Sequence, residues 1–263
     1  MSNVVTPAIL HALLKGAVLS VELSVLTYGL ALLFGLIAAL MRRSRNVVVK
    51  GVARFYIELF RGTPALVQIF FAYFATPQIF AWLNRLVFEP LSGGRVMIPP
   101  PLSPFAAAVL ALSMGYGAYL AEVIRAGIES IHKGQVEAAA SLGLGGRDIM
   151  RFVVIPPAIR LMIPPFGNYA LALLKDSSLA STISVVELTL STERAISYNY
   201  QPAMMWAAAA VIYLALSIVG SFLFSYLEVV ADPIRRRRGR PLTRLATASE
   251  GAGAGTGDEE GGA

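Results

Sequence analysis

The chain has 263 residues, of which 56% are hydrophobic and 14% charged, and its formal net charge is +6 at pH 7. Soluble domains carry about 25% charged residues, so this composition predicts an integral membrane protein. The absence of cysteine excludes disulfide and thiolate chemistry. The basic residues cluster beside apolar runs, a pattern that encodes membrane topology, so the positive charge does not indicate nucleic-acid binding.

The first apolar segment predicts a membrane span at residues 16–41, which is long enough to cross a bilayer with some tilt. Glu22 lies inside this span, where it is either an interfacial acid or an ion or substrate site. Basic residues follow the span and do not precede it, which argues against a cleaved signal peptide and favours an N-terminus outside the membrane. These basic residues are Arg42, Arg43, Arg45 and Lys50.

An amphipathic helix is expected after this cluster. Arg54, Glu58 and Arg61 have helical spacing, so we expect them to pair along one helix face near the inner membrane surface. The second span follows at residues 65–83, with Gln68 as a polar group inside it.

The third span is predicted at residues 105–124, after a proline-containing outer loop at residues 84–104. Small residues within this span allow close approach between helices. Glu122 and Arg125 mark its inner boundary, and we expect them to form a local surface salt bridge.

A polar segment at residues 130–160 separates the third and fourth spans. Its first part favours a short helix that runs to about Leu142, since alanine and glutamate are good helix formers. Gly143 then suits a turn with positive φ, which glycine adopts at little steric cost. Pro156 and Pro157 are expected to end a second short helix, because neither can donate to a helical ladder. The segment is therefore predicted to be a helix–elbow–helix at the water-facing membrane surface.

The same segment resembles the EAA loop of the permease subunits of bacterial ABC importers. The tripeptide Glu137-Ala138-Ala139 is followed by Gly143 and, after nine residues, by Val-x-Ile-Pro, where the family has Ile-x-Leu-Pro. The resemblance covers most of residues 15–230 and implies a type I importer fold, all-α, with the elbow as a cytoplasmic coupling loop. Other segments are similar to the polar-amino-acid branch, with its histidine and glutamine permeases: residues 58–64, 119–125 with 134–135, and 174–179.

The fourth span is expected at residues 161–186, with breaks at the sequence Pro-Pro-Phe-Gly and again at residues 175–178. Irregular backbone at membrane depth occurs where protein or a water-filled cavity covers it, so this span is predicted to line the substrate path. Alternatively, Lys175 snorkels to an interface and pairs with Asp176. The candidate path residues are Gln68, Lys175, Asp176, Ser177 and Ser178.

A second outer loop is expected at residues 187–202, and the last span at residues 203–230. The tail at residues 235–263 begins with a basic cluster and continues as a Gly/Ala/Glu-rich segment that we expect to be disordered. Residues 1–234 then form one transmembrane domain. Basic residues are concentrated on the proposed inner segments, which predicts an N-terminus outside and a C-terminus in the cytoplasm.

Three functions remain open from the residues alone. In the first, the chain is the membrane subunit of an ATP-driven importer; it has no G-x-x-x-x-G-K-[ST] sequence, so a separate subunit would bind ATP and Mg. In the second, an ion gradient drives transport and Glu22 and Asp176 carry the ion. In the third, the chain is a membrane adaptor that transports nothing. We see no catalytic residue and no metal site, since His11 and His132 are isolated.

The resemblance favours the first function and implies the partners. These are a dimer of ABC ATP-binding subunits, a second permease chain (identical or homologous) and a periplasmic or external amino-acid-binding protein. It implies uptake of a polar amino acid across the inner membrane by a chain that is not itself an enzyme. The sequence identifies neither the amino acid nor the second permease. The residues to which the resemblance assigns ATPase coupling are Glu137, Ala138, Ala139 and Gly143.

Overall fold

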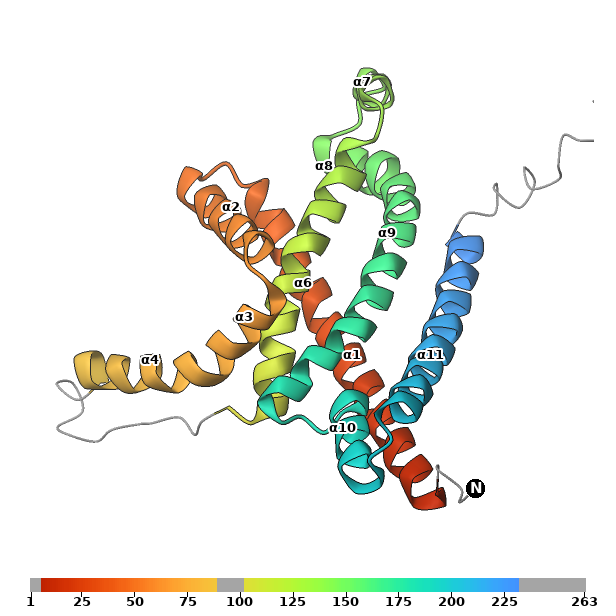
Figure 1. Ribbon diagram of the computed structural model, residues 1–263. Helices are drawn as coiled ribbons and strands as arrows, with labels where there is room; N and C mark the ends of the chain where they lie inside the picture. The colour runs from red at the N-terminus through yellow and green to blue at the C-terminus, as the bar shows by residue number, and fades with distance from the viewer. Residues whose placement is uncertain (1–5, 89–101, 232–263) are drawn as a thin grey trace, which may run out of the picture.

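The computed structural model describes residues 6–88 and 102–231, and every regular element in this part of the chain is a helix (Figure 1). Five helical segments are long and apolar enough to cross a membrane, which confirms the predicted all-α fold with five spans. These segments are Pro7–Arg42, Ala65–Leu86, Pro104–Glu129, Gly146–Ile183 and Pro202–Val230.

The core is built on helices α1 (Pro7–Arg42) and α6 (Pro104–Glu129), which pack along each other through small residues. A Cβ added to Gly35 would lie 3.0 Å from the Gly117 carbonyl oxygen, and one added to Gly117 would lie 2.9 Å from Phe34 Cβ. Among the five spans α6 is the most enclosed, with 61% of its apolar window buried. The other spans are therefore arranged around it (Figure 1).

Both helices are longer than predicted. α1 begins at Pro7 and not at residue 16, because the Thr6 hydroxyl accepts a hydrogen bond from the Ile9 N–H and proline is favourable at the first helical position. α6 continues past residue 124 to Glu129, since Arg125 pairs with Glu129 one turn later and stabilises the extra turn.

Helix α2 (Val47–Gly62) is amphipathic, as predicted, and lies beside the C-terminal ends of α1 and α6 (Figure 1). Its predicted charge pairing is wrong. Within the described ranges Glu58 forms no ion pair, and Arg61 instead approaches Glu122 of α6, with 4.0 Å between Nη1 and Oε1. Arg61 therefore links α2 to the bundle.

The second span is helical but irregular, and Figure 1 shows its α4 part projecting away from the bundle. The helix continues five residues into the predicted outer loop at residues 84–104. Residues 89–101 of that loop lie outside the described part of the chain. In order, the elements are α3 (Ala65–Phe70), the π-helical turn η1 (Phe71–Ala75), α4 (Thr76–Leu83) and a second π-helical turn, η2 (Asn84–Phe88).

Two predictions about prolines are wrong. Pro156 and Pro157 do not end a helix, and Pro164 and Pro165 do not break the fourth span. The chain instead stays helical over one long run, residues 146–183, which connects the loop to the fourth span without a break. Its elements are α8 (Gly146–Asp148), η3 (Ile149–Val154), α9 (Ile155–Asp176) and the 3₁₀ turn η4 (Ser177–Ile183).

The prolines are tolerated for identifiable reasons. A proline ring collides with the carbonyl four residues earlier in an α-helix, and a π turn widens the helix there. η1 comes directly before the segment that contains Pro77, and η3 before Pro156. The next pair of prolines leaves the carbonyls of Arg160 and Leu161 without helical donors. Both residues lie at the start of the predicted fourth span and are exposed in the isolated chain.

Gly167 does not break α9 but lets it approach α11 (Pro202–Ala231), because an added Cβ would lie 3.0 Å from Phe224. The second predicted irregularity of this span, at residues 175–178, is confirmed. The α-helix changes to the 3₁₀ turn η4 at Ser177, and this turn ends at Ser184, which has φ of 69°. Within the predicted span at residues 161–186, the helix is thus irregular only at its far end.

The predicted outer loop at residues 187–202 is mostly a helix, α10 (Leu188–Asn199). Glu187 caps it, since its carboxylate accepts a hydrogen bond from the Leu190 N–H at 3.0 Å. The segment is short and polar, which is why its sequence suggested a loop, and contacts with α1 and α11 hold it in place. α11 confirms the last span, whereas the tail at residues 235–263 lies outside the described part.

Candidate functional site

The segment between α6 and α9 carries a short helix, α7 (Lys133–Ser141), which projects from one end of the bundle (Figure 1). The Ala139 side chain is buried and packs with Ile149 and Val154, so the helix is fixed to the bundle on one side only. We call residues 133–146 the α7 elbow. Its outer side is open to solvent or to a partner.

The elbow turns at Gly143, which has φ of +81° and confirms the predicted positive-φ turn. The Gly143 N–H donates to the Ala140 carbonyl at 3.0 Å, and the Leu144 N–H donates to the Ala139 carbonyl at 3.3 Å. This pair of bonds defines a Schellman C-cap. No atom outside the immediate chain neighbours lies within 4 Å of a Cβ added at Gly143. The glycine is therefore required by its backbone conformation and not by crowding.

The predicted coupling residues divide between two sides of the elbow. Glu137 and Ala138 are exposed, whereas Ala139 faces the bundle. Two large apolar side chains that sequence reasoning missed, Leu142 and Phe152, are 84% and 64% exposed on the same segment. Apolar side chains offer area for a partner to bury.

A cavity of about 300 Å³ lies between α3, α6 and α9. This volume is at the lower end of the range for small-ligand sites. Its lining combines aromatic rings with one carboxylate, and we call it the tyrosine cavity. Its polar and aromatic lining residues include Gln68, Tyr116, Tyr119, Tyr169 and Asp176.

Two hydrogen-bonded groups fix the polar lining. The Tyr116 hydroxyl donates to Asp176 Oδ2 at 2.8 Å, which joins α6 to the end of α9. Gln68 Nε2 donates to the carbonyl and hydroxyl oxygens of Thr63 at 3.0 and 2.9 Å. A Cβ added to Gly115 would lie 2.5 Å from Gln68 Oε1, so glycine makes room for the amide. Within the described residues Asp176 has no cationic partner, so its carboxylate can attract a cation in the cavity.

Aromatic rings form another wall of the tyrosine cavity. Tyr119 and Tyr169 are stacked with their centroids 5.6 Å apart, and Tyr116 meets Tyr169 edge-on at 6.4 Å. Ring faces of this kind attract ammonium and guanidinium groups. Arg61 illustrates the effect, since its Cζ lies 5.6 Å from the Tyr119 centroid. The cavity therefore suits a small ligand that carries a positive charge.

The candidate path residues do not all come together. Gln68 and Asp176 line the tyrosine cavity. Lys175 is exposed, and the described residues contain no Lys175–Asp176 ion pair, so the predicted alternative of a snorkelling pair is not formed. Ser177 is buried and donates to the Leu174 carbonyl at 2.8 Å, which leaves it a structural role.

A cluster of charges joins α1, α2 and α6 near the elbow. Glu122 accepts from Arg42 and from Arg125 Nε, the latter at 2.8 Å, and Arg61 approaches it at 4.0 Å. The predicted local salt bridge is thus part of a contact between helices. No group of three or more His, Cys, Asp or Glu residues within 6–88 and 102–231 could hold a metal ion.

A second carboxylate is buried near the start of α10. Glu187 is fully buried, and Glu187 Oε2 accepts from Ser20 Oγ at 3.1 Å and from the Tyr213 hydroxyl at 2.8 Å. Burial raises the pKa of Glu187 above the usual carboxyl range, and the hydrogen bonds offset this only in part. The residue ties α10 to α1 and α11.

Comparisons with known proteins give one consistent picture. Residues 31–229 match the family model described as binding-protein-dependent transport system inner membrane component. The chain is 37% identical over 226 residues to the glutamine transport system permease protein GlnP of Escherichia coli (strain K12), covering 86% of this chain and 95% of that protein. It is 38% identical over 227 residues to the octopine transport system permease protein OccM of Rhizobium radiobacter, covering 86% and 88%.

Solved structures share the helical arrangement. A crystal structure of an amino acid ABC transporter with histidines superposes with a TM-score of 0.70 at 34% identity, covering 82% of this chain and 92% of that chain. An inward-facing structure of the MetNI methionine ABC transporter gives a TM-score of 0.62 at 15% identity, covering 86% and 99%. The second likeness shows the fold alone.

Proposed function

Since the chain belongs to the family of inner membrane components of binding-protein-dependent transport systems, we propose that it carries a polar amino acid into the cell. It is the permease subunit of an ABC importer, which works with an ATPase subunit and a substrate-binding protein, and it is not itself an enzyme. Relatives named for glutamine and octopine transport, and an amino acid transporter with histidines, support this class of substrate.

The observation that carries the proposal is the position of Asp176 in the tyrosine cavity. The α-ammonium group of an amino acid would donate a charge-assisted hydrogen bond to the carboxylate of Asp176. The ring of Tyr169, which lines the same cavity, would stabilise the same positive charge. Arg61, which lies over Tyr119, would meet the α-carboxylate. The cavity, together with Arg61 beside it, would thus complement both charges of the substrate.

Energy would enter at the α7 elbow. Glu137, Ala138 and Leu142 form an exposed surface there for the ATPase subunit, which would bind ATP and Mg²⁺. An unbroken helical run from Gly146 to Ile183 connects the elbow with Asp176. Because a helix transmits displacement along its axis, movement of the elbow would shift the wall of the tyrosine cavity.

The proposed assembly and orientation follow from the assignment of the chain as the permease subunit of an ABC importer. The elbow end would face the cytoplasm, since basic residues gather there beside the ends of α1 and α6, with the N-terminus outside and the C-terminus inside. A second permease chain, identical or homologous, would complete the pathway. The external solute-binding protein would deliver the amino acid at the opposite end, where α10 lies.

ATP dependence of uptake tests the proposed function. The permease, its ATPase and the cognate binding protein are reconstituted in vesicles, and entry of labelled polar amino acids is measured with ATP and with ion gradients. We expect uptake that requires ATP and the binding protein. Uptake driven by a proton or sodium gradient without ATP would support an ion-driven secondary transporter instead, and no uptake of any amino acid would support an adaptor.

Thiol labelling tests the orientation, and the native chain gives no background because it has no cysteine. Ser197→Cys on α10 should react with a membrane-impermeant thiol reagent added outside. Ser141→Cys on α7 should react only after permeabilisation. Both side chains are exposed in the isolated chain. Labelling of Ser141→Cys from outside would overturn the orientation. Ser92, in the predicted outer loop at residues 84–104, is a third position expected to react from outside, and it lies outside the described residues.

A further inference from the structure

A second cavity, of about 430 Å³, lies where the end of α1, α2 and the end of α6 meet. It is distinct from the tyrosine cavity and shares no lining residue with it. Most of its lining is basic, and we call it the basic cavity. Its charged lining residues are Arg42, Arg43, Lys50, Arg54, Arg125 and Glu129.

Only part of this positive charge is neutralised within the chain. Arg42 and Arg125 pair with Glu122, and Arg125 also pairs with Glu129. In contrast, Arg43, Lys50 and Arg54 form no ion pair anywhere in residues 6–88 and 102–231, and all are exposed. Five cations meet two carboxylates, so three positive charges are left around a concave space. Such an arrangement attracts a compact anion.

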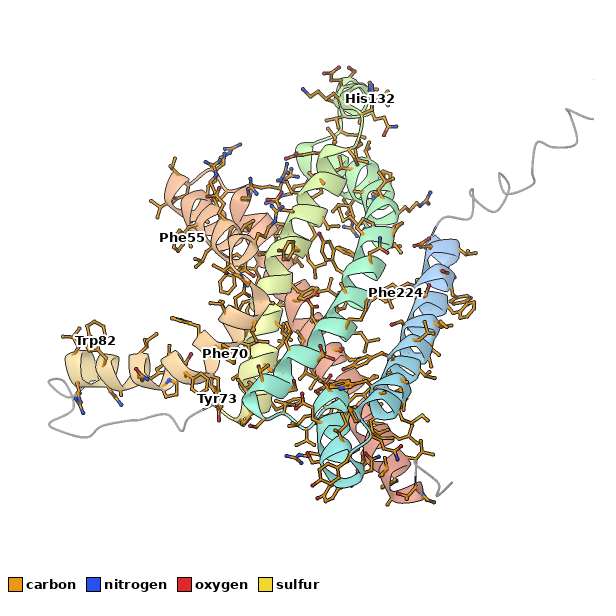
Figure 2. All side chains as sticks on the ribbon, viewed as in Figure 1. Phe55, Phe70, Tyr73, Trp82, His132 and Phe224 are labelled. Atoms are coloured by element: carbon orange, nitrogen blue, oxygen red, sulfur yellow. The ribbon has the colours of Figure 1, made fainter. Side chains whose placement is uncertain are left out.

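The two sides of helix α2 indicate where the basic cavity lies relative to the membrane. Val48, Val52, Phe55 and Leu59 form an exposed apolar strip along it, and Figure 2 shows Phe55 on its outer side. Lys50 and Arg54 lie on the opposite side of the same helix, next to the buried Ala53 and Ile57. A helix with an apolar strip on one side and a basic strip on the other lies in the membrane interface, with its basic strip among the headgroups.

We propose that the basic cavity binds the phosphate-bearing headgroup of an anionic phospholipid of the cytoplasmic leaflet, such as phosphatidylglycerol. The placement in that leaflet rests on the orientation given under the proposed function. The phosphate would pair with Arg43, Lys50 and Arg54, whose charges no carboxylate of the described chain neutralises. The acyl chains would enter the bilayer that the apolar strip of α2 faces.

A lipid explains the surroundings better than a protein partner does. The cavity is a small concave space on the basic side of α2, whose opposite side carries the exposed apolar strip, and an anionic phospholipid combines a phosphate with hydrocarbon in one molecule. The bound headgroup would bridge α2 to the ends of α1 and α6. Because Arg42 and Arg61 also contact Glu122, the lipid would stabilise the helix packing beside the tyrosine cavity.

Lipid binding to the assembled importer tests the proposal. The complex is purified in detergent and titrated with phosphatidylglycerol or phosphatidylcholine, and bound lipids are counted by native mass spectrometry. The test variant combines Arg43→Gln, Lys50→Gln and Arg54→Gln. Each surface cation contributes about five-fold to the affinity for anionic lipid, so the triple variant should bind phosphatidylglycerol about a hundred-fold more weakly. Phosphatidylcholine should bind weakly to both proteins.

The control removes the same charge elsewhere and combines Lys15→Gln, Arg85→Gln and Arg194→Gln, none of which lines the basic cavity. It should bind phosphatidylglycerol as the unmodified complex does. Lys50→Gln alone, which breaks no ion pair, should still cause about a five-fold loss and guards against misfolding of the triple variant.

Three results would overturn the proposal: unchanged phosphatidylglycerol binding in the triple variant, equal loss in the control, or inorganic phosphate that binds as tightly as the lipid. Loss of the ATPase subunit from the triple variant, with lipid retained, would likewise assign the cavity to a protein contact. Because binding is measured in detergent, it does not depend on which end faces the cytoplasm. A wrong orientation would appear in the thiol labelling of Ser141→Cys and Ser197→Cys.

Discussion

The α7 elbow and the tyrosine cavity are built in opposite ways. The elbow is a local structure, closed by hydrogen bonds from Gly143 and Leu144 to carbonyls of the preceding turn, with one side exposed. The tyrosine cavity is assembled from distant segments, and its key hydrogen bond joins Tyr116 to Asp176 across 60 positions of the sequence. One is a surface suited to a partner, and the other is a concave space suited to a small ligand.

This difference indicates that the two regions can be damaged separately. A change confined to the elbow should alter the contact with the ATPase and leave ligand binding intact. A change in the cavity should alter ligand binding and leave the ATPase in place. The helical run from Gly146 to Ile183 connects the regions, so only transport requires both.

The largest effect is expected for Gly143→Val. A β-branched residue in the left-handed region is strained by about 1–2 kcal/mol, which corresponds to a roughly five- to thirty-fold shift in a conformational equilibrium. The variant should insert normally, because no span is altered, yet uptake should fall by about five- to thirty-fold as ATPase binding or its coupling is weakened. Membrane abundance, co-purified ATPase and uptake are measured together.

Gly146→Val is the matched control for this prediction. A Cβ at either glycine meets nothing within 4 Å, but only Gly143 has a left-handed backbone. The control should keep most of its uptake. Normal uptake and ATPase recovery in Gly143→Val would reduce the elbow to a simple connector.

A smaller and different effect is expected for Asp176→Asn. Asparagine keeps an oxygen for the Tyr116 hydroxyl but removes the charge that would hold the substrate ammonium. Hydrogen bonds to charged groups contribute about 1.5–3 kcal/mol, so the KM for uptake should rise about ten-fold or more, with ATPase binding unchanged. Lys175→Met should change KM little, since Lys175 is exposed and does not line the cavity. Unaltered KM in Asp176→Asn would remove the cavity from the substrate path.

The smallest effect is expected for Glu187, which lies in neither the α7 elbow nor the tyrosine cavity. It serves as a reference for a change outside both regions. Because burial raises its pKa, the folded protein holds this proton more tightly than the unfolded chain does. The free energy of unfolding that this tighter proton binding contributes is present in full below the usual carboxyl pKa. It is lost as pH rises through the raised pKa of Glu187, by at most about 1.4 kcal/mol per pH unit. Thermal unfolding followed against pH should show this loss, and Glu187→Gln should flatten it. Identical pH dependence in both proteins would contradict the account.

Local features of this chain were predictable from its sequence, and features that depend on contacts between helices were not. Hydropathy identified five spans, and the glycine after the alanine run identified the turn at Gly143. The continuity of the fourth span was missed because a π turn ahead of Pro156 depends on how the chain is packed. α10 was missed because Glu187 holds it through partners on two other helices.

The tyrosine cavity was found only in part for the same reason. Gln68 and Asp176 were candidates because polar groups inside spans are unusual. Tyr116 and Tyr119 stand three residues apart and share a helix face, a signal that could have added them to the candidates. Tyr169 stacks on Tyr119 from another helix, a pairing that no local pattern encodes.

The central claim is that the exposed side of the α7 elbow contacts the ATPase, and site-directed crosslinking tests it most directly. Ala138→Cys, which lies on that side, is labelled with a thiol-reactive photo-crosslinker in the assembled importer, with Ser197→Cys on α10 as the control. We predict that irradiation joins the permease to the ATPase subunit from Ala138→Cys and not from Ser197→Cys. Capture of the ATPase from Ser197→Cys, or of the external binding protein from Ala138→Cys, would contradict the account.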